Sequence, residues 1–379
     1  MRNIFIIVLS LLSNGHTETA LAQAADTQHK ANTQLSDSDA RQNAWIVMGD
    51  SCMDAFNLFQ ALQCYEKAYA ITPTRNVMSK LGECYYKRGA YLQCTDILEK
   101  LDEQQEEGEK LGLKDMRTLY YSYAKLEKRK NRDKWGNRIV ENYPYDAALL
   151  SDYARRLNAE NRPETAHAFL ANYYQKDSTD MHITLQLADA SFLMLNFNNA
   201  KKLYQRIIKA GDVSFDVSYS LGMCFFQEEK WDSAYYYLLR AAEINSYKNV
   251  GCLYRLGLSA VRKGAPAEGI RCLNIAIQEA NPSPKLMIHL HETLADAYEK
   301  KGDSRNQLET LKECLQYDGN NMQIYYKLAQ AYQSIGDKEN ARHHYNSFLG
   351  LARMISERDR SDDLKQVVKI AEYEVSRLK

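Results

Sequence analysis

Small residues recur along this chain at a nearly constant interval, and this period restricts the fold more than any other feature. They occupy the eighth position of successive units at Gly49, Gly82, Ala154, Ala188, Gly222, Gly257, Ala295 and Ala329. In most units another small residue follows twelve positions later, at Ala61, Cys94, Ala166, Ala200, Ala234, Gly269 and Ala341. Short side chains let two helix backbones approach closely, whereas bulky ones would overpack the crossing. Each unit is therefore predicted to be an antiparallel helical hairpin.

A large apolar residue follows in most units, four positions after the second small one. These residues are Tyr65, Leu98, Leu170, Tyr204, Leu238, Leu273, Leu311 and Tyr345. They are expected to project onto the next unit, because one hairpin cannot bury its apolar face alone. The units start near residues 42, 75, 113, 147, 181, 215, 250, 288 and 322. The third fits least well, since Arg132 and Gly136 suit neither position; it is either a hairpin with a shifted second helix or a local break.

The first unit carries the fullest pattern, with Trp45, Met48, Gly49, Ala61, Tyr65, Ala68 and Pro73 at fixed spacing. This pattern resembles the tetratricopeptide repeat family. The resemblance implies an all-α fold, a right-handed α-solenoid of about nine helical hairpins over residues 42–355. Residues 356–379 carry one apolar stripe, at Leu364, Val367, Val368, Ala371, Val375 and Leu378. That stripe predicts a C-terminal capping helix, which a solenoid needs to cover its last surface.

The N-terminus has the pattern of an export signal. Arg2 precedes an apolar core from Ile4 to Leu12, and Ala20-Leu21-Ala22 offers a small-x-small cleavage site. We expect a signal peptide over residues 1–22 cleaved after Ala22, a flexible lead-in over 23–41, and a periplasmic or secreted mature protein. An uncleaved membrane anchor is the alternative, but the apolar core is far shorter than the roughly 20 residues that span a bilayer.

Composition and motifs narrow the function classes. Lys+Arg and Asp+Glu both number 49, and this balance argues against nucleic-acid binding, which needs a basic surface. We find no catalytic constellation and expect no enzyme, cofactor or metal site. His289 and His291 are two residues apart on a helix and cannot share a metal ion. Cys64 and Cys84 either form a disulfide between neighbouring units or remain free thiols on apolar helix faces.

The resemblance implies that first helices line a concave groove, and that chaperone-binding members clamp a terminal carboxylate with Asn at position 9. That position holds Asp50, Glu83, Tyr121, Arg155, Asp189, Met223, Leu258, Asp296 and Gln330, so the clamp is not expected. In repeats five to seven the groove positions are apolar or aromatic, at Leu185, Phe192, Tyr219, Met223, Phe226, Tyr254, Leu258 and Val261.

Charged residues flank this apolar strip on both sides, which is the anatomy of a protein-binding surface. We therefore predict a non-catalytic scaffold or adaptor that binds a protein or peptide segment there, within an envelope complex. No membrane span is expected after signal removal. Two alternatives remain: a cell-wall or carbohydrate-associated binding module, and a superhelix whose inner face packs on itself.

Overall fold

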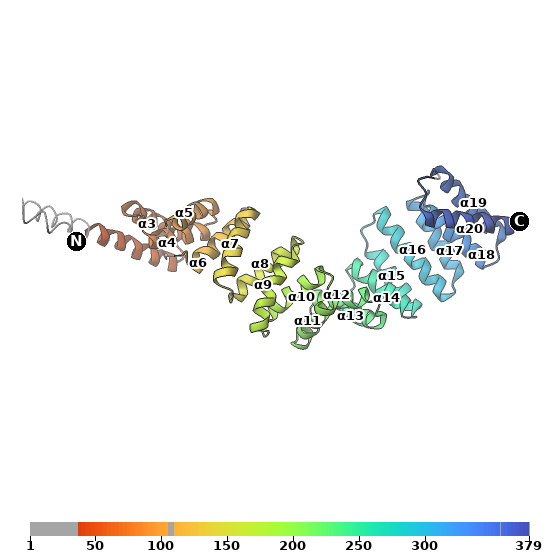
Figure 1. Ribbon diagram of the computed structural model, residues 1–379, viewed down its shortest axis with the longest axis horizontal. Helices are drawn as coiled ribbons and strands as arrows, with labels where there is room; N and C mark the ends of the chain where they lie inside the picture. The colour runs from red at the N-terminus through yellow and green to blue at the C-terminus, as the bar shows by residue number, and fades with distance from the viewer. Residues whose placement is uncertain (1–36, 105–109, 357, 379) are drawn as a thin grey trace, which may run out of the picture. The chain divides into compact units, whose positions relative to one another are not determined.

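The computed structural model describes residues 37–104, 110–356 and 358–378 of the chain, and these form helices and turns with no strand among them (Figure 1). They divide into two compact units, and the boundary between the units falls between Leu149 and Leu150. The prediction of an all-α solenoid of helical hairpins is confirmed. None of the helices in the described ranges is both long and apolar enough to cross a membrane. The predicted signal peptide and residues 23–36 of the lead-in lie outside the described residues.

The first unit contains three hairpins. Its helices are one over 37–54, α3 (Leu58–Ile71), α4 (Arg75–Lys87), α5 (Tyr91–Glu103), α6 (Leu113–Lys125) and α7 (Arg129–Asn142). The helix over 37–54 pairs with α3. Residues 37–41 are helical, although the sequence placed them in the lead-in. Helix formation continues upstream because Gln42 is buried, and its side chain donates hydrogen bonds to the carbonyls of Ala68 and Thr72 at the end of α3.

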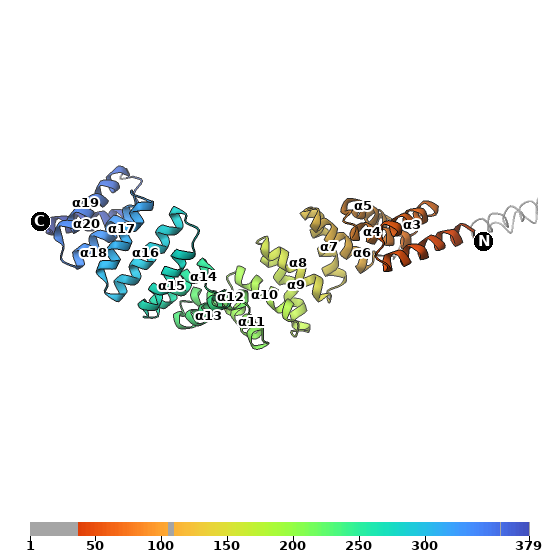
Figure 2. The same ribbon diagram turned by 180° about the vertical axis from the view of Figure 1, so that it is seen from behind.

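The second unit continues the same pattern to the C-terminus. Its helices are α8 (Ala147–Ala159), which begins just before the unit, α9 (Pro163–Lys176), α10 (Met181–Leu193), α11 (Phe197–Lys209), α12 (Phe215–Gln227), α13 (Trp231–Ile244), α14 (Val250–Arg262), α15 (Pro266–Glu279), α16 (Pro284–Lys301), α17 (Ser304–Tyr317), α18 (Met322–Ser334), α19 (Lys338–Met354) and α20 (Asp362–Arg377). Seen from both sides (Figures 1 and 2), α16, α17 and α18 lie side by side, as their contacts require.

A residue with positive φ ends each first helix and starts the turn to the second. Glycine takes this place in four hairpins, where its lack of a Cβ makes the left-handed conformation accessible. The nine turn residues are Phe56, Gly89, Glu127, Asn161, Leu195, Glu229, Gly264, Gly302 and Gly336. Asn or Asp then caps several second helices; Asn196, for example, accepts a hydrogen bond from the backbone N–H of Asn199. These two signals fix where each hairpin turns.

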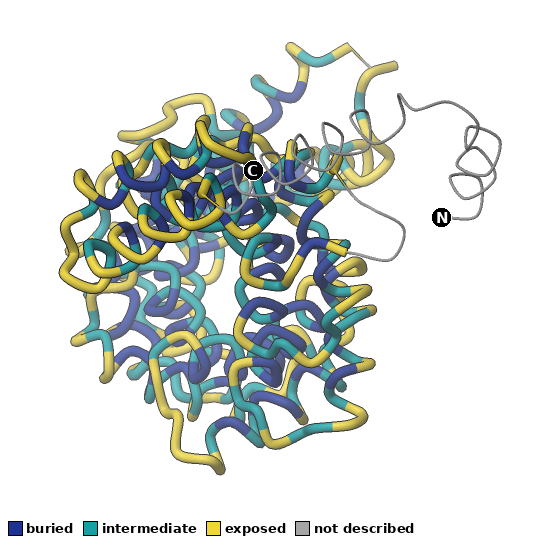
Figure 3. The backbone as a smooth tube through the Cα atoms, turned by 90° about the vertical axis from the view of Figure 1, so that its left-hand side faces the viewer, coloured by how far each residue is buried: buried dark blue, intermediate teal, exposed yellow. Residues whose placement is uncertain are grey.

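The helix crossings depend on the small residues that set the sequence period. A Cβ added to Gly82 would lie 2.5 Å from Leu98, and one added to Gly257 would lie 2.8 Å from Leu273. Leu98 and Leu273 are fully buried, so there is no free volume beside either glycine. Figure 3 shows the result, with buried stretches running along the helices and exposed turns at their ends.

The third hairpin is helical, and its second helix keeps the register of the others, so neither a shifted second helix nor a local break is found. Helix α7 contacts α6. Trp135 is completely buried and takes the place of the large apolar residue that Gly136 cannot supply. Arg132 is also buried, but its guanidinium pairs with Asp133 at 2.6 Å, which neutralises its charge. The pattern therefore weakens here because a tryptophan one position earlier supplies the buried bulk, while the helix itself is not displaced.

The capping helix is confirmed. The apolar stripe of α20 packs against the ninth hairpin, and Ala371 and Leu378 are buried in the same cluster as Leu328, Tyr345 and Phe348. The remaining stripe residues, Leu364, Val367, Val368 and Val375, are partly buried against that cluster. Exposed polar residues cover the other side of α20, so the last hairpin does not end in bare apolar surface.

All eight cysteines lie in the described ranges and are free thiols. The disulfide alternative for Cys64 and Cys84 is therefore not realised in this structure. The thiol beside Cys64 is Cys52 of the same hairpin, while Cys84 donates a weak hydrogen bond to the carbonyl of Leu58. Burial raises the pKa of Cys84 to about 11. These side chains thus behave as small apolar packing groups.

Candidate binding surface

The first helices of neighbouring hairpins in the second unit contact one another directly. Helix α12 contacts α14, and α14 contacts α16, in addition to the contacts that each makes with its own second helix. Side chains of these first helices that point away from their own second helices therefore form one surface over α12, α14 and α16. Helix α10 adjoins it, because the charge of Asp216 on α12 acts on Asp189 of α10. We call this surface, on α10, α12, α14 and α16, the first-helix face.

The eight predicted groove residues all lie on three consecutive first helices. Leu185 and Phe192 are on α10, and the others are on α12 and α14, namely Tyr219, Met223, Phe226, Tyr254, Leu258 and Val261. Met223 is buried, with 7% of its surface exposed, and the other seven are half-buried. Half-burial is typical of a side chain that packs at its base and leaves its tip accessible.

The contacts of five of these residues separate them into two groups. Phe192, Phe226 and Val261, at the ends of their helices, turn toward their own second helices. Phe192 contacts Phe197 with ring centroids 5.5 Å apart, Phe226 contacts Trp231 at 5.4 Å, and Val261 lies against Gly269. These three therefore also serve hairpin packing, a role that the sequence prediction did not give them.

The second group lies toward the adjacent first helices. Tyr219 stacks on Phe215 of α12 at 5.5 Å, and the positive charge of Arg255 on α14 acts on its hydroxyl. Tyr254 of α14 contacts the His289 ring of α16 at 4.7 Å. The aromatic side chains thus continue from one first helix to the next across the face.

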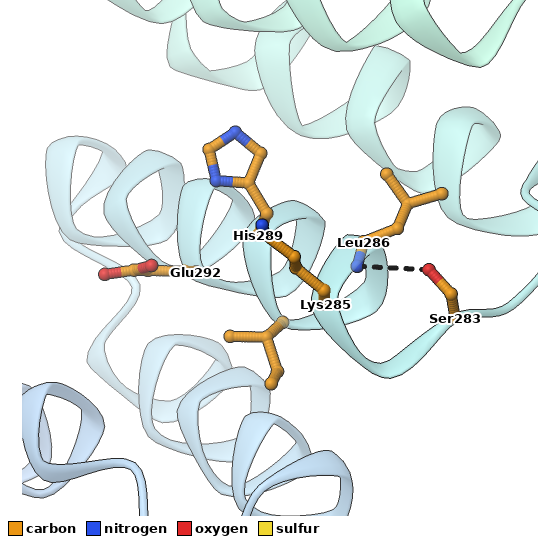
Figure 4. Close-up of a pocket in the computed structure, with 6 residues that line it drawn as sticks. Ser283, Lys285, Leu286, His289 and Glu292 are labelled. Carbon is orange, nitrogen blue, oxygen red and sulfur yellow. Dashed lines mark hydrogen bonds between the residues drawn. The ribbon is translucent and has the colours of Figure 1, made fainter.

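A hollow of about 550 Å³ adjoins this aromatic surface on α16. Its lining consists of Ser283, Lys285, Leu286, Ile288, His289 and Glu292. Figure 4 shows Leu286 and His289 projecting from the same side of α16, with the backbone N–H of Leu286 bonded to the Ser283 hydroxyl. The sequence prediction missed this hollow because it started the eighth unit at residue 288.

The extra turn of α16 begins at Pro284, where the sequence analysis had not expected helix. Ser283 caps the helix and Pro284 is its first residue. Proline is favoured at that position because its missing N–H has no partner there in any case. The Ser283-Pro284 pair is thus the sequence signal from which the earlier start of the helix, and with it the positions of Leu286 and His289, could have been predicted.

Charged side chains of first helices pair between neighbouring hairpins. Lys327 of α18 contacts Asp296 of α16 at 2.8 Å and Glu292 at 3.0 Å. Burial opposes the charge of Lys327, but these two carboxylates outweigh it and raise the pKa of the ammonium. Glu292 and Asp296, two of the charged residues that flank the apolar strip, are thus neutralised within the chain.

The first unit contains the same kind of pair. Asp50 accepts hydrogen bonds from the Tyr65 hydroxyl and from Lys80 of the next hairpin, both at 2.7 Å. Burial alone would raise the pKa of Asp50, yet the bonds from Lys80 and Tyr65 lower it. Glu83 is likewise paired, with Lys114 and with Lys87.

Sequence models of the family described as Tetratricopeptide repeat match residues 185–249, 288–321 and 323–353. These matches cover hairpins five, six, eight and nine. The chain is a tetratricopeptide repeat protein. Such proteins are generally non-catalytic scaffolds that bind protein or peptide partners, and this chain is a protein–protein interaction scaffold in that sense.

Solved tetratricopeptide repeat structures are similar over parts of this chain. YrrB, described as a TPR protein with an unusual peptide-binding site, is 20% identical with a TM-score of 0.45; the match covers 50% of this chain and 95% of YrrB. MamA from MSR-1 is 24% identical with a TM-score of 0.42, covering 46% and 97%. Cut9–Hcn1 of APC/C is 14% identical with a TM-score of 0.41, covering 87% and 76%. A search of curated protein sequences gave no match.

Proposed function

We propose that this protein is an exported adaptor that holds a segment of a partner protein on the first-helix face of repeats five to seven. One observation carries the proposal: half-buried apolar and aromatic side chains continue over three consecutive first helices, α10, α12 and α14. Contiguous apolar surface with a charged border marks interaction sites, because leaving such surface in water costs free energy.

The turn that follows α10 supports the same proposal. Leu193, Met194 and Leu195 are consecutive and exposed, and the fractional exposure of Leu195 reaches 72%. They directly follow Phe192, so the apolar surface extends to the edge of the fifth repeat. Leu195 also adopts a φ of 60°, which disfavours a branched side chain with a Cβ. The hairpin turn accounts for the positive φ, but no packing role accounts for the exposure of this leucine.

Export is supported by the N-terminal sequence pattern. A positive residue, a short apolar core and an Ala-Leu-Ala site stand in the order that signal peptides require. The proposed place of action is thus the periplasm or the cell surface, as part of an envelope complex.

The test exchanges two aromatic residues of the face for charged ones. Phe226→Asp with Tyr254→Asp should abolish recovery of the bound partner when the tagged protein is purified from cells that make it. Tyr236→Asp is the matched control, because Tyr236 is 58% exposed on the second helix α13. Unchanged recovery with the double variant, in a protein whose far-UV dichroism stays helical, would remove the proposal.

A further inference from the structure

An acidic residue at position 9 of a first helix normally finds its cation on the next hairpin. Asp50 pairs with Lys80, Glu83 with Lys114, and Asp296 with Lys327. Lys80 and Lys327 both stand at the sixth position of their units, so the same geometry occurs twice. In these three repeats the chain neutralises its own carboxylate.

Asp189 of repeat five is the exception. The sixth position of the following unit holds Ser220 instead of a lysine. Ser220 lies where that lysine would be, because its hydroxyl interacts with Tyr204, and Tyr204 donates a hydrogen bond of 2.6 Å to Asp189. Within the described ranges, no Lys, Arg or His side chain forms an ion pair with Asp189.

The surroundings of Asp189 make its charged carboxylate unfavourable when no cation is present. Asp189 is half-buried, and burial raises the pKa of its carboxyl, with the negative charge of Asp216 on α12 adding to the effect. The aromatic pair Phe215 and Tyr219 stands on the same helix as Asp216. A carboxylate taken partly out of water without a counter-ion destabilises the protein until a cation arrives.

We propose that the partner segment held on the first-helix face carries a lysine or arginine, set among apolar residues, whose cationic group pairs with Asp189 in the place that Lys80 and Lys327 occupy in other repeats. This inference rests on the proposed function and specifies the chemistry of the partner. Asp189 supplies the charge recognition, while Tyr219, Tyr254 and Leu258 supply the apolar contact.

A random peptide library displayed on phage serves as the probe. We select peptides on the full-length protein and discard those that also bind the Phe226→Asp, Tyr254→Asp variant. The remaining peptides should be enriched in Lys or Arg among apolar residues. Selection on Asp189→Lys should replace that preference with Asp or Glu. Enriched peptides without a basic preference would overturn this inference alone, whereas failure to enrich any peptide would overturn the proposed function and this inference with it.

The affinity of one selected peptide then tests the pairing directly. Asp189→Asn keeps an acceptor for the Tyr204 hydroxyl but removes the charge, and it should weaken binding roughly 10- to 100-fold. Replacing the basic residue of the peptide by norleucine should weaken binding by the same factor. Making both changes together should weaken binding no more than either change alone. Asp50→Asn is the matched control, since it alters the corresponding Tyr–Asp hydrogen bond outside the surface and should leave affinity unchanged. Equal affinity for Asp189→Asn and the unaltered protein would contradict the pairing.

A substitution within the chain gives an independent readout without peptide. Ser220→Lys restores the arrangement of Asp50 with Lys80, so it should raise the thermal unfolding midpoint and weaken the peptide at least roughly tenfold. An unchanged midpoint together with unchanged affinity would show that Asp189 does not require a cation.

Discussion

At the two glycines where the helices of the seventh hairpin cross, packing decides whether a substitution by alanine stabilises or destabilises the protein. Gly257 on α14 and Gly269 on α15 face each other. A Cβ added to Gly269 would lie 2.5 Å from Val261 Cγ2 and 2.9 Å from the carbonyl oxygen of Gly257. The side chain of Val261 can rotate, but the backbone oxygen cannot move away without separating the helices. Gly269→Ala is therefore expected to strain the crossing.

The magnitude follows from two opposing effects. Alanine in a helix interior is favoured over glycine by about 0.5–1 kcal/mol, since it loses less backbone entropy. Overpacking a filled crossing costs about 1–3 kcal/mol. Gly269→Ala should then destabilise the protein by about 1–2 kcal/mol. Gly350→Ala is the matched control: Gly350 lies within α19, and no atom stands within 4 Å of the added Cβ. That change should stabilise the protein by about 0.5–1 kcal/mol.

Urea unfolding followed by far-UV circular dichroism measures both variants under the same conditions. The unfolding midpoint should fall for Gly269→Ala and rise for Gly350→Ala. Adding Val261→Ala to Gly269→Ala should restore only part of the loss, because the contact with the Gly257 carbonyl remains. A rise of equal size in both single variants would refute the reasoning that close backbone approach holds these hairpins together.

Three further predictions concern single sites. Leu195→Gly should stabilise the protein by about 0.5–1 kcal/mol in the same unfolding assay, because glycine adopts a positive φ without strain; destabilisation would contradict this. Burial, together with His343 and Lys312, lowers the pKa of His344. The unfolded chain therefore binds a proton at a higher pH than the folded chain, so the free energy of unfolding should fall as pH drops below about 6.5. Between about pH 7.5 and about pH 5.5 the His344→Gln variant should lose less of its unfolding free energy than the unaltered protein. An identical loss in the two proteins would contradict this prediction. Intact-mass measurement of the exported protein should place its N-terminus at Gln23, and a chain starting at Met1 would disprove cleavage.

The hairpin architecture was predictable because its signals are local and repeated. Gly82 and Cys94 mark one crossing, and an equivalent pair of small residues marks most of the others. The capping helix was equally accessible, since its apolar stripe appears in the sequence at helical spacing. Such features need no knowledge of distant contacts.

Other features depend on contacts that a periodic pattern cannot express. Trp135 fills the core beside Gly136, although it stands one position before the large apolar residue that the pattern marks. Phe226 and Val261 occupy groove positions, yet their contacts with Trp231 and Gly269 emerge only in three dimensions. The missing cation beside Asp189 also could not be recognised from the sequence. It is recognised only by comparison with Asp50 and Asp296, each of which pairs with a lysine of the next repeat.

Site-specific photocrosslinking in the cells that make the protein tests the central claim most directly. Benzoylphenylalanine replaces Tyr219 on the first-helix face or, as control, the exposed Tyr236 on α13. We predict that ultraviolet light produces a discrete covalent adduct with a partner protein from position 219 and none from position 236. Adducts from position 236 alone, or equal adducts from both, would contradict a partner-binding surface on the first helices.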